Sequence, residues 1–200
     1  MEYMKPNGKQ SPNIAKMINN LCDTNEAEAE FRTNLVIRMI VKALAEDRHI
    51  IVLSDRRDHL KNMGKLLEEH NGVEVGFMVG GIKPADIATA SACRVIMATY
   101  AYCSEGFDIP SLDTCVFATP RSDIVQCCGR ILRYHPSKQV PRVIDFVDDS
   151  PVFHGQARKR KAYYTKLGAF INPLSEFLEN NTVDEKDELV ARSEDFPFMA

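Results

Sequence analysis

The stretch that decides the fold is His49–Gly81, HIIVLSDRRDHLKNMGKLLEEHNGVEVGFMVGG. It begins with a short apolar run, His49–Ser54, which has the pattern of a strand buried on both faces. Asp58–His70 follows with leucines and methionines at helical spacing, and Asn71-Gly72 is a typical helix stop. Val73–Val79 is a second apolar run, closed by two glycines. Strand, helix and strand in this order predict a βαβ unit with parallel strands.

The same alternation continues on both sides of this unit. Further strands are expected at 93–99, 114–119 and 140–147, and further helices at 13–22, 25–47, 83–92, 121–133 and 153–167. Asn25 is the expected cap of the second helix, and Pro84 suits the first turn of the fourth. This rhythm predicts an α/β domain with a mainly parallel sheet flanked by helices on both faces. Its functional loops are expected at the carboxyl ends of the strands.

Composition and charge divide the chain into three expected regions. Residues 1–24 are a flexible lead with a short helix, 25–172 the folded domain, and 173–200 a segment with an acidic, disordered tail. The net charge of −3 conceals an asymmetry, because 181–200 sum to −4 and 121–166 to +6. The basic segment indicates a polyanionic partner.

Several protein classes are excluded by the same arithmetic. At 200 residues and 44% hydrophobic content, the chain fits one globular domain. It has neither a signal-peptide pattern nor an apolar run of membrane-spanning length, so no membrane partner is expected. Its six cysteines include no C-x-x-C pair, which predicts an intracellular, reducing location.

The first candidate for chemistry is Val95–Thr114, VIMATYAYCSEGFDIPSLDT. A buried strand ends near Thr99, and the loop beyond it carries Glu105, Gly106 and Asp108. Gly106 allows a tight turn, and the Asp108 carboxylate could accept hydrogen bonds from ribose hydroxyls. In the alternative interpretation, Asp108 only caps a turn.

The second candidate is Asp123–Arg133, DIVQCCGRILR. On a helix, Gln126, Arg130 and Arg133 fall on one face and form a cluster of donors suited to phosphate oxygens. Gly129 would let a ligand or another chain approach closely. The alternative is a set of ordinary surface arginines paired with acids.

Taken together, these segments resemble the second RecA-like domain of superfamily 2 helicases, in the DExH branch that includes proteins of large DNA viruses. IIVLSDRRDHL resembles motif IV of that family, ATYAYCSEGFDIP motif V, and QCCGRILR motif VI, Q-x-x-G-R-x-x-R. The resemblance covers roughly residues 30–172. One departure is Cys127, where many relatives carry arginine.

The resemblance implies roles for individual residues. Arg130 and Arg133 would be arginine fingers for the γ-phosphate of ATP, with Gln126 positioning the nucleotide or its water. A nucleotide-binding group would approach the ribose and phosphates: Glu105, Gly106, Asp108 and Gly129. A nucleic-acid-binding group would contact the backbone of the strand: Ser54, Arg56, Gly81 and Thr99.

The sequence also lacks half of what an ATPase needs. It contains no G-x-x-x-x-G-K-[ST] loop, and its two Asp-Glu pairs, Asp184-Glu185 and Asp187-Glu188, both lie in the acidic tail. We therefore expect the C-terminal motor domain of a larger ATP-dependent helicase, which alone does not hydrolyse ATP. ATP with Mg²⁺ would be bound mainly by an N-terminal RecA-like domain of the same protein.

The expected partners and location follow from the same resemblance. The polyanion would be single-stranded or duplex nucleic acid, DNA in preference to RNA, bound by a monomer. A viral protein of this kind would act in the cytoplasm of an infected cell or in the virion, with the nucleus as another location.

Two other functions stay open at this point. Cys127–Arg133 satisfies C-x5-R, the phosphate loop of cysteine phosphatases, although that loop should join a strand end to a helix start. The second open function is that of a RecA-like module that binds nucleic acid or protein without catalysis. The RKRK run at 158–161 predicts either a nuclear localisation patch or one side of an amphipathic closing helix.

Overall fold

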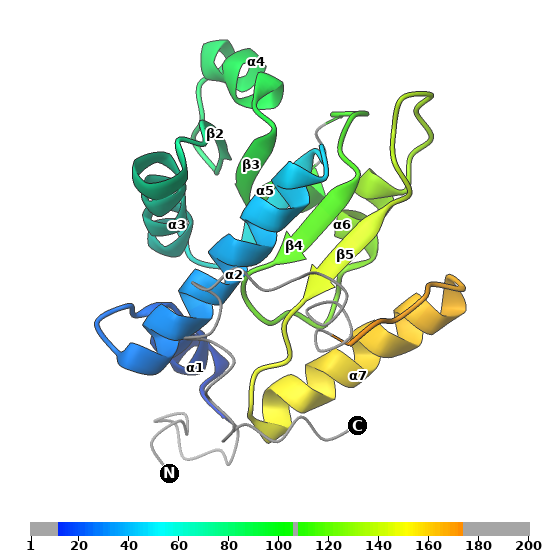
Figure 1. Ribbon diagram of the computed structural model, residues 1–200. Helices are drawn as coiled ribbons and strands as arrows, with labels where there is room; N and C mark the ends of the chain where they lie inside the picture. Colours follow the sequence, from blue (N-terminus) through cyan, green and yellow to red (C-terminus); the bar gives the residue numbers. More distant parts are fainter. Residues whose placement is uncertain (1–11, 106–107, 174–200) are drawn as a thin grey trace. The chain divides into compact units, whose positions relative to one another are not determined.

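The structure is a computed structural model that describes residues 12–105 and 108–173 (Figure 1). The chain divides into two units, residues 1–161 and 162–200, and the first contains the whole sheet. Its strands are β1 (Ile50–Ser54), β2 (Val75–Met78), β3 (Val95–Thr99), β4 (Thr114–Phe117) and β5 (Arg142–Asp145). The helices are α1 (Ile14–Cys22), α2 (Ala27–Ala45), α3 (Arg57–Asn71), α4 (Pro84–Ala92), α5 (Tyr100–Glu105), α6 (Val125–Ile131) and α7 (Pro151–Lys166), the last of which continues into the second unit.

The five strands form one parallel sheet in the order β2-β3-β1-β4-β5, which confirms the predicted fold class. β1 lies at its centre, and every residue of this strand is buried. The carboxyl ends of β1 and β3 are in register, because Ser54 pairs with Thr99. The loop that follows β1 and the helix α5, which directly follows β3, therefore begin side by side.

The strand order explains why helices cover both faces of the sheet. The crossover from β1 to β2 runs in one direction, and the crossovers from β2 to β3, β4 and β5 run back in the other. Right-handed crossovers then put α3 on one face and α4, α5 and α6 on the opposite face. α2 packs on β1, β4 and α3, and Figure 1 shows it crossing the sheet on that side.

Local signals placed several helix ends correctly. Gly72 ends α3 with a left-handed φ of 63°, and Pro84 occupies the first turn of α4. Asn25 was wrongly predicted as a cap. Its amide donates to Asp23 Oδ1 at 2.7 Å, and α2 begins after Glu26 without a side-chain cap.

The helix expected at 121–133 is shorter than predicted. Asp123 Oδ1 accepts the backbone N–H of Val125 at 3.4 Å, a local turn that delays the start of α6. α6 ends at Ile131, so Arg133 lies beyond the helix. Pro136 restricts the residue before it, which disfavours a longer helix. The short helix α5 was not foreseen, because its segment was predicted as a loop.

In the described part of the chain, no helix has both the length and the apolar character needed to cross a lipid bilayer.

Candidate functional site

The motif V and motif VI segments meet where α5 packs against α6. Arg130, near the end of α6, donates from Nε and Nη2 to the backbone carbonyl of Cys103 at 3.4 and 3.3 Å. Its side chain is half-buried, and the carbonyl fixes its direction. Arg130, the predicted arginine finger, is therefore held in place by α5, the helix of the motif V segment.

Arg133 and Asp108 form an ion pair that joins the loop after α6 to the loop before β4. The two side chains are 45% and 67% exposed. An ion pair this exposed contributes little to stability, because water and salt screen it. Both charged groups therefore remain accessible to a ligand.

The other nucleotide candidates lie on the same two helices or beside them. Gln126 is exposed on α6, and Glu105 is exposed at the end of α5. A Cβ added at Gly129 would meet no heavy atom within 4 Å, so the space beside this glycine is open. Gly106 lies outside the described residues.

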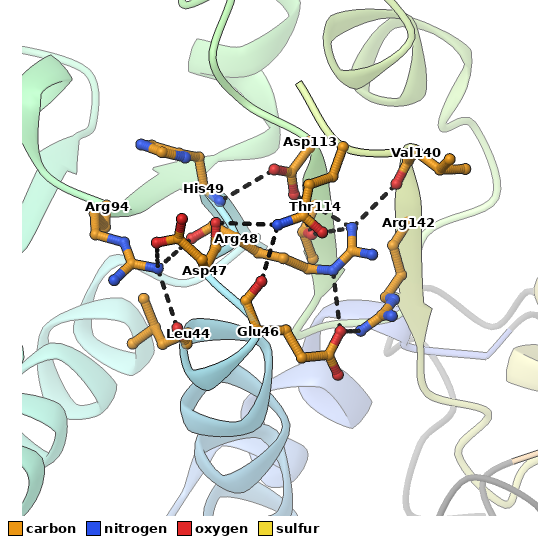
Figure 2. A network of polar contacts seen from close by, with 11 residues as sticks. Leu44, Glu46, Asp47, Arg48, His49, Arg94, Asp113, Thr114, Val140 and Arg142 are labelled. Atoms are coloured by element: carbon orange, nitrogen blue, oxygen red, sulfur yellow. Dashed lines mark hydrogen bonds and ion pairs between the residues drawn. The ribbon is translucent and has the colours of Figure 1, made fainter. Parts of the chain in front are cut away.

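The amino ends of the strands carry a polar network, here called the Arg48 cluster, that motif reading did not single out (Figure 2). Arg48 Nη1 donates to Asp113 Oδ1 at 3.4 Å, to Thr114 Oγ1 at 3.4 Å and to the Val140 carbonyl at 3.0 Å. Arg48 is only 7% exposed. Asp113 ends the loop that carries Asp108, and Val140 ends the loop that carries Arg133. The buried Arg48 guanidinium thus holds both loops close to the points where they lead into β4 and β5.

Further ion pairs extend the Arg48 cluster to α2 and β5. Glu46 accepts from Arg48 Nε at 3.3 Å and pairs with Arg142 at 2.7 Å. Arg94 pairs with Asp47 at 3.0 Å and donates to the Leu44 carbonyl at 3.0 Å. The signal for these residues was present in the sequence, since charged residues that flank a buried strand must find partners.

The nucleic-acid candidates lie at the opposite edge, beyond the carboxyl ends of the strands. Ser54 is fully buried there, and its hydroxyl contacts His59 Nδ1 at 3.3 Å and accepts the Arg56 N–H at 3.1 Å. The Ser54 side chain therefore does not reach the surface. Thr99 is partly exposed, and its hydroxyl accepts the Tyr102 N–H at 3.3 Å.

Arg56 and Gly81 follow β1 and β2 at the same edge. Arg56 is held by α1, where it donates to the Ala15 carbonyl at 3.0 Å and to Asn19 Oδ1. A hollow of about 520 Å³ lies between residues of α1 and α3 beside it. Gly81 is exposed in a turn with a φ of 90°, a conformation that suits glycine. It lines a second hollow, of about 420 Å³, beside β2 and α4.

Arg121, in the loop after β4, is the centre of a second network, here called the Arg121 cluster. It pairs with Asp55 at 3.0 Å and lies over the Tyr100 ring at 5.1 Å. Tyr100 donates to the Thr119 carbonyl at 2.6 Å, and Thr119 Oγ1 accepts the Asp55 N–H at 2.9 Å. The cluster therefore joins the loops that follow β1 and β4 to the first residue of α5.

The RKRK run does not form a uniform surface patch. Arg160 is only 1% exposed, pairs with Asp145 at 2.8 Å and donates to the Arg121 carbonyl at 2.8 Å. Arg158, Lys159 and Lys161 are exposed. This pattern fits the amphipathic closing helix rather than an exposed basic signal.

His59 is buried under the carboxyl edge and stays neutral. It is 2% exposed, and its Nε2 lies 3.3 Å from Thr33 Oγ1. Burial, aided by the positive charge of Arg32, lowers the pKa of His59 from 6.5 to about 4.

Cys127 occupies the interior of α6 and packs against Cys103 of α5. A hydrogen bond from the Cys103 thiol lowers the pKa of Cys127, and both residues are buried. A cysteine phosphatase needs its thiolate in a loop between a strand end and a helix start. Cys127 is not in such a loop, so the C-x5-R interpretation is wrong.

Comparisons with known proteins find viral relatives by sequence. No protein-family model matches the sequence. L396 of Acanthamoeba polyphaga mimivirus, whose name describes an ATP-dependent RNA helicase, is 32% identical over 158 residues, which are 78% of this chain and 30% of L396. QP509L of African swine fever virus (isolate Pig/Kenya/KEN-50/1950), whose name describes the same kind of helicase, is 30% identical over 97 residues, 48% of this chain and 19% of QP509L.

Solved structures share the fold at lower identity. T4 UvsW matches with a TM-score of 0.59 and 20% identity, over 80% of this chain and 36% of that one. The SWI2/SNF2 ATPase core domain of Sulfolobus solfataricus matches with a TM-score of 0.57 and 13% identity, over 88% and 39%. The chain is thus similar in sequence to viral proteins named as ATP-dependent RNA helicases, and it shares the RecA-like fold of these solved proteins. The chain spans less than a third of the length of either viral relative, 30% of L396 and 19% of QP509L.

Proposed function

We propose that this chain is the C-terminal motor domain of an ATP-dependent nucleic-acid helicase or translocase. In this proposal, ATP lies in the cleft between it and an N-terminal RecA-like domain of the same protein. Hydrolysis opens and closes the cleft and moves the strand. The observation that carries the proposal is that both arginines of the motif VI segment contact the motif V segment, Arg130 at the Cys103 carbonyl and Arg133 at Asp108.

The donor set at this place suits a nucleoside triphosphate. Two guanidinium groups match phosphate oxygens, and the Asp108 carboxylate can accept from ribose hydroxyls if ATP displaces Arg133 from it. Within residues 12–105 and 108–173 there is no cluster of three or more acids, histidines and cysteines that could hold a metal ion. Because the sequence has no G-x-x-x-x-G-K-[ST] loop, whose hydroxyl residue would bind Mg²⁺, we assign the ligands of Mg²⁺ to the N-terminal domain.

Arginine fingers act on the charge that develops during phosphoryl transfer. Such residues are worth about 10³–10⁵ in rate in related phosphoryl-transfer enzymes. Gln126, exposed on the same helix, would position the nucleotide or the attacking water. Gly129 leaves open space through which the nucleotide or the other domain can approach.

The nucleic-acid track is assigned to the carboxyl edge of the sheet. Thr99, Arg56 and Gly81 lie there, and backbone groups of the Ser54 loop accompany them because the Ser54 hydroxyl is buried. Contacts of this kind bind phosphate and do not read bases. The preference for DNA over RNA stays a prediction, and binding of matched DNA and RNA strands tests it.

The test of the motor role uses the protein with both RecA-like domains. Arg130→Ala and Arg133→Ala should each lower ATP turnover by about 10³-fold or more with nearly unchanged ATP binding, because the fingers stabilise transition-state charge. Arg158→Ala, an exposed arginine of α7, is the matched control and should retain turnover.

Near-normal turnover in both finger variants would contradict the motor role. It would favour the module that binds nucleic acid or protein without catalysis. The 200-residue chain alone should show no ATP hydrolysis, with or without nucleic acid.

A further inference from the structure

The Arg121–Asp55 ion pair lies in the part of the structure to which the nucleic-acid track is assigned. Arg121 Nη1 donates to Asp55 Oδ1 at 3.0 Å, and the two side chains are 39% and 25% exposed. Asp55 directly precedes Arg56, and Tyr100, under the Arg121 guanidinium, directly follows Thr99. The pair is thus adjacent in sequence to two of the proposed track residues.

Two buried residues, Arg160 and Tyr100, hold Arg121 in place. Its backbone carbonyl accepts from buried Arg160 at 2.8 Å, and its guanidinium lies 5.1 Å from the centre of the buried Tyr100 ring. Contact with an aromatic face restricts the orientation of a guanidinium, and the Arg121 side chain is still 39% exposed to solvent. Little side-chain entropy remains to be lost when this guanidinium binds an anion.

The chemistry of the pair favours exchange with phosphate. A guanidinium binds carboxylate and phosphate with the same geometry, so a phosphate oxygen can take the place of the Asp55 carboxylate. Asp55 also contributes a negative charge that repels a phosphodiester backbone. By contrast, buried Arg32 forms two bonds to Asp148 and a third to the Ala118 carbonyl, which leaves it committed to the fold.

We propose that Arg121 is a phosphate-binding residue of the nucleic-acid track and that Asp55 is its internal competitor. Without nucleic acid, Asp55 holds the guanidinium, and a backbone phosphate replaces it on binding. This inference rests on the proposed function, because it adds a residue and a competing anion to the same track.

The test compares two variants that remove the same charge at opposite edges of the sheet. Asp55→Asn should tighten binding of the 200-residue chain to a labelled 20-nucleotide single strand, DNA or RNA, by about three- to fivefold at low salt. Glu46→Gln is the matched control, because Glu46 is 35% exposed and pairs with Arg142 at the amino edge. It should change affinity by less than half as much.

Arg121→Gln should weaken binding and make the slope of log affinity against log salt shallower by about 0.7, the value for one phosphate of a single strand. When Asp55→Asn is added to Arg121→Gln, it should no longer tighten binding relative to Arg121→Gln alone. Thermal unfolding of each variant separates loss of affinity from loss of structure.

Three results would overturn the inference. In one, the wild-type chain binds with a steep salt dependence, but Asp55→Asn and Glu46→Gln have equal effects; the proposed track then stands and only the Arg121 assignment falls. In another, Asp55→Asn tightens binding of a polyglutamate peptide as strongly as that of nucleic acid, which indicates a general anion effect. In the third, no variant binds nucleic acid at low salt, and the track itself is withdrawn.

Discussion

An arginine–aspartate ion pair lies at each of the two edges of the sheet, and the two pairs differ in function. In the Arg48 cluster at the amino edge, Arg48 and Asp113 are 8% and 3% exposed in their side chains. In the Arg121 cluster at the carboxyl edge, Arg121 and Asp55 are 39% and 25% exposed. A buried arginine with several partners holds loops together. A partly exposed arginine that pairs with one carboxylate of the described residues can exchange this carboxylate for a ligand.

The difference follows from desolvation. A guanidinium removed from water must keep all its partners, because an unpaired buried charge is costly. A guanidinium that keeps part of its hydration loses little when one partner leaves. Burial therefore indicates which arginines of this domain are structural, and partial exposure indicates which can bind.

The largest expected effect is on the Arg48 cluster. Arg48→Met should lower the free energy of unfolding by about 3–5 kcal/mol, because it leaves the buried Asp113 carboxylate without its guanidinium. Urea unfolding measures the change. The double variant with Asp113→Asn should recover part of the loss, since the uncompensated charge is then gone. A cost below about 1 kcal/mol for Arg48→Met would break the distinction between the two edges.

A smaller effect on the free energy of unfolding is expected from the titration of His59, the buried histidine at the carboxyl edge. The pKa of His59 is about 4 in the folded chain and 6.5 when exposed, so the unfolded chain takes up the proton first as the pH falls. Stability is then fully retained above pH 6.5 and falls between pH 6.5 and 4. The loss is about 3 kcal/mol in total, at about 1.4 kcal/mol per pH unit.

The measurement is the free energy of unfolding of the wild-type chain and His59→Gln across this range. Their difference should diminish as the pH falls, because glutamine does not titrate. A constant difference from pH 7 to pH 4 would mean that His59 is not held neutral by the fold.

The smallest effect on stability is expected at Arg121. Arg121→Met keeps an apolar chain over the Tyr100 ring and removes only a partly exposed ion pair, so the cost should be about 1 kcal/mol or less. Chemical denaturation checks this, beside Arg48→Met as the buried counterpart. A loss as large as that of Arg48→Met would place Arg121 with the structural arginines and weaken its assignment to the track.

Much of the fold could be predicted from the sequence because its signals are local. Apolar runs such as Ile50–Ser54 and helical spacing such as that of Arg57–Asn71 are set by neighbouring residues. The parallel sheet follows from their alternation. The ends of helices were predicted less accurately, as with α6, because a turn at Asp123 and a proline after Arg133 compete with helical periodicity.

The candidate nucleotide site was also accessible from the sequence in part. Arg130 and Arg133 stand in one motif at a fixed spacing, so their identity needed no tertiary contact. The contacts that hold these arginines are tertiary, however. Arg130 donates to the Cys103 carbonyl of α5, and Arg133 pairs with Asp108 of another loop. Ser54 was assigned to the strand track from its position after β1, and only the structure shows that its side chain is buried.

The sequence by itself determined the order of strands and helices and the two arginines of motif VI. Tertiary structure alone decided which other arginines are structural and which can bind. Arg48 finds Asp113 and Val140 at separations of 65 and 92 residues, and Arg121 finds Asp55 at 66. No local pattern encodes such pairs, because the sheet brings them together only after its strands have taken the order β2-β3-β1-β4-β5.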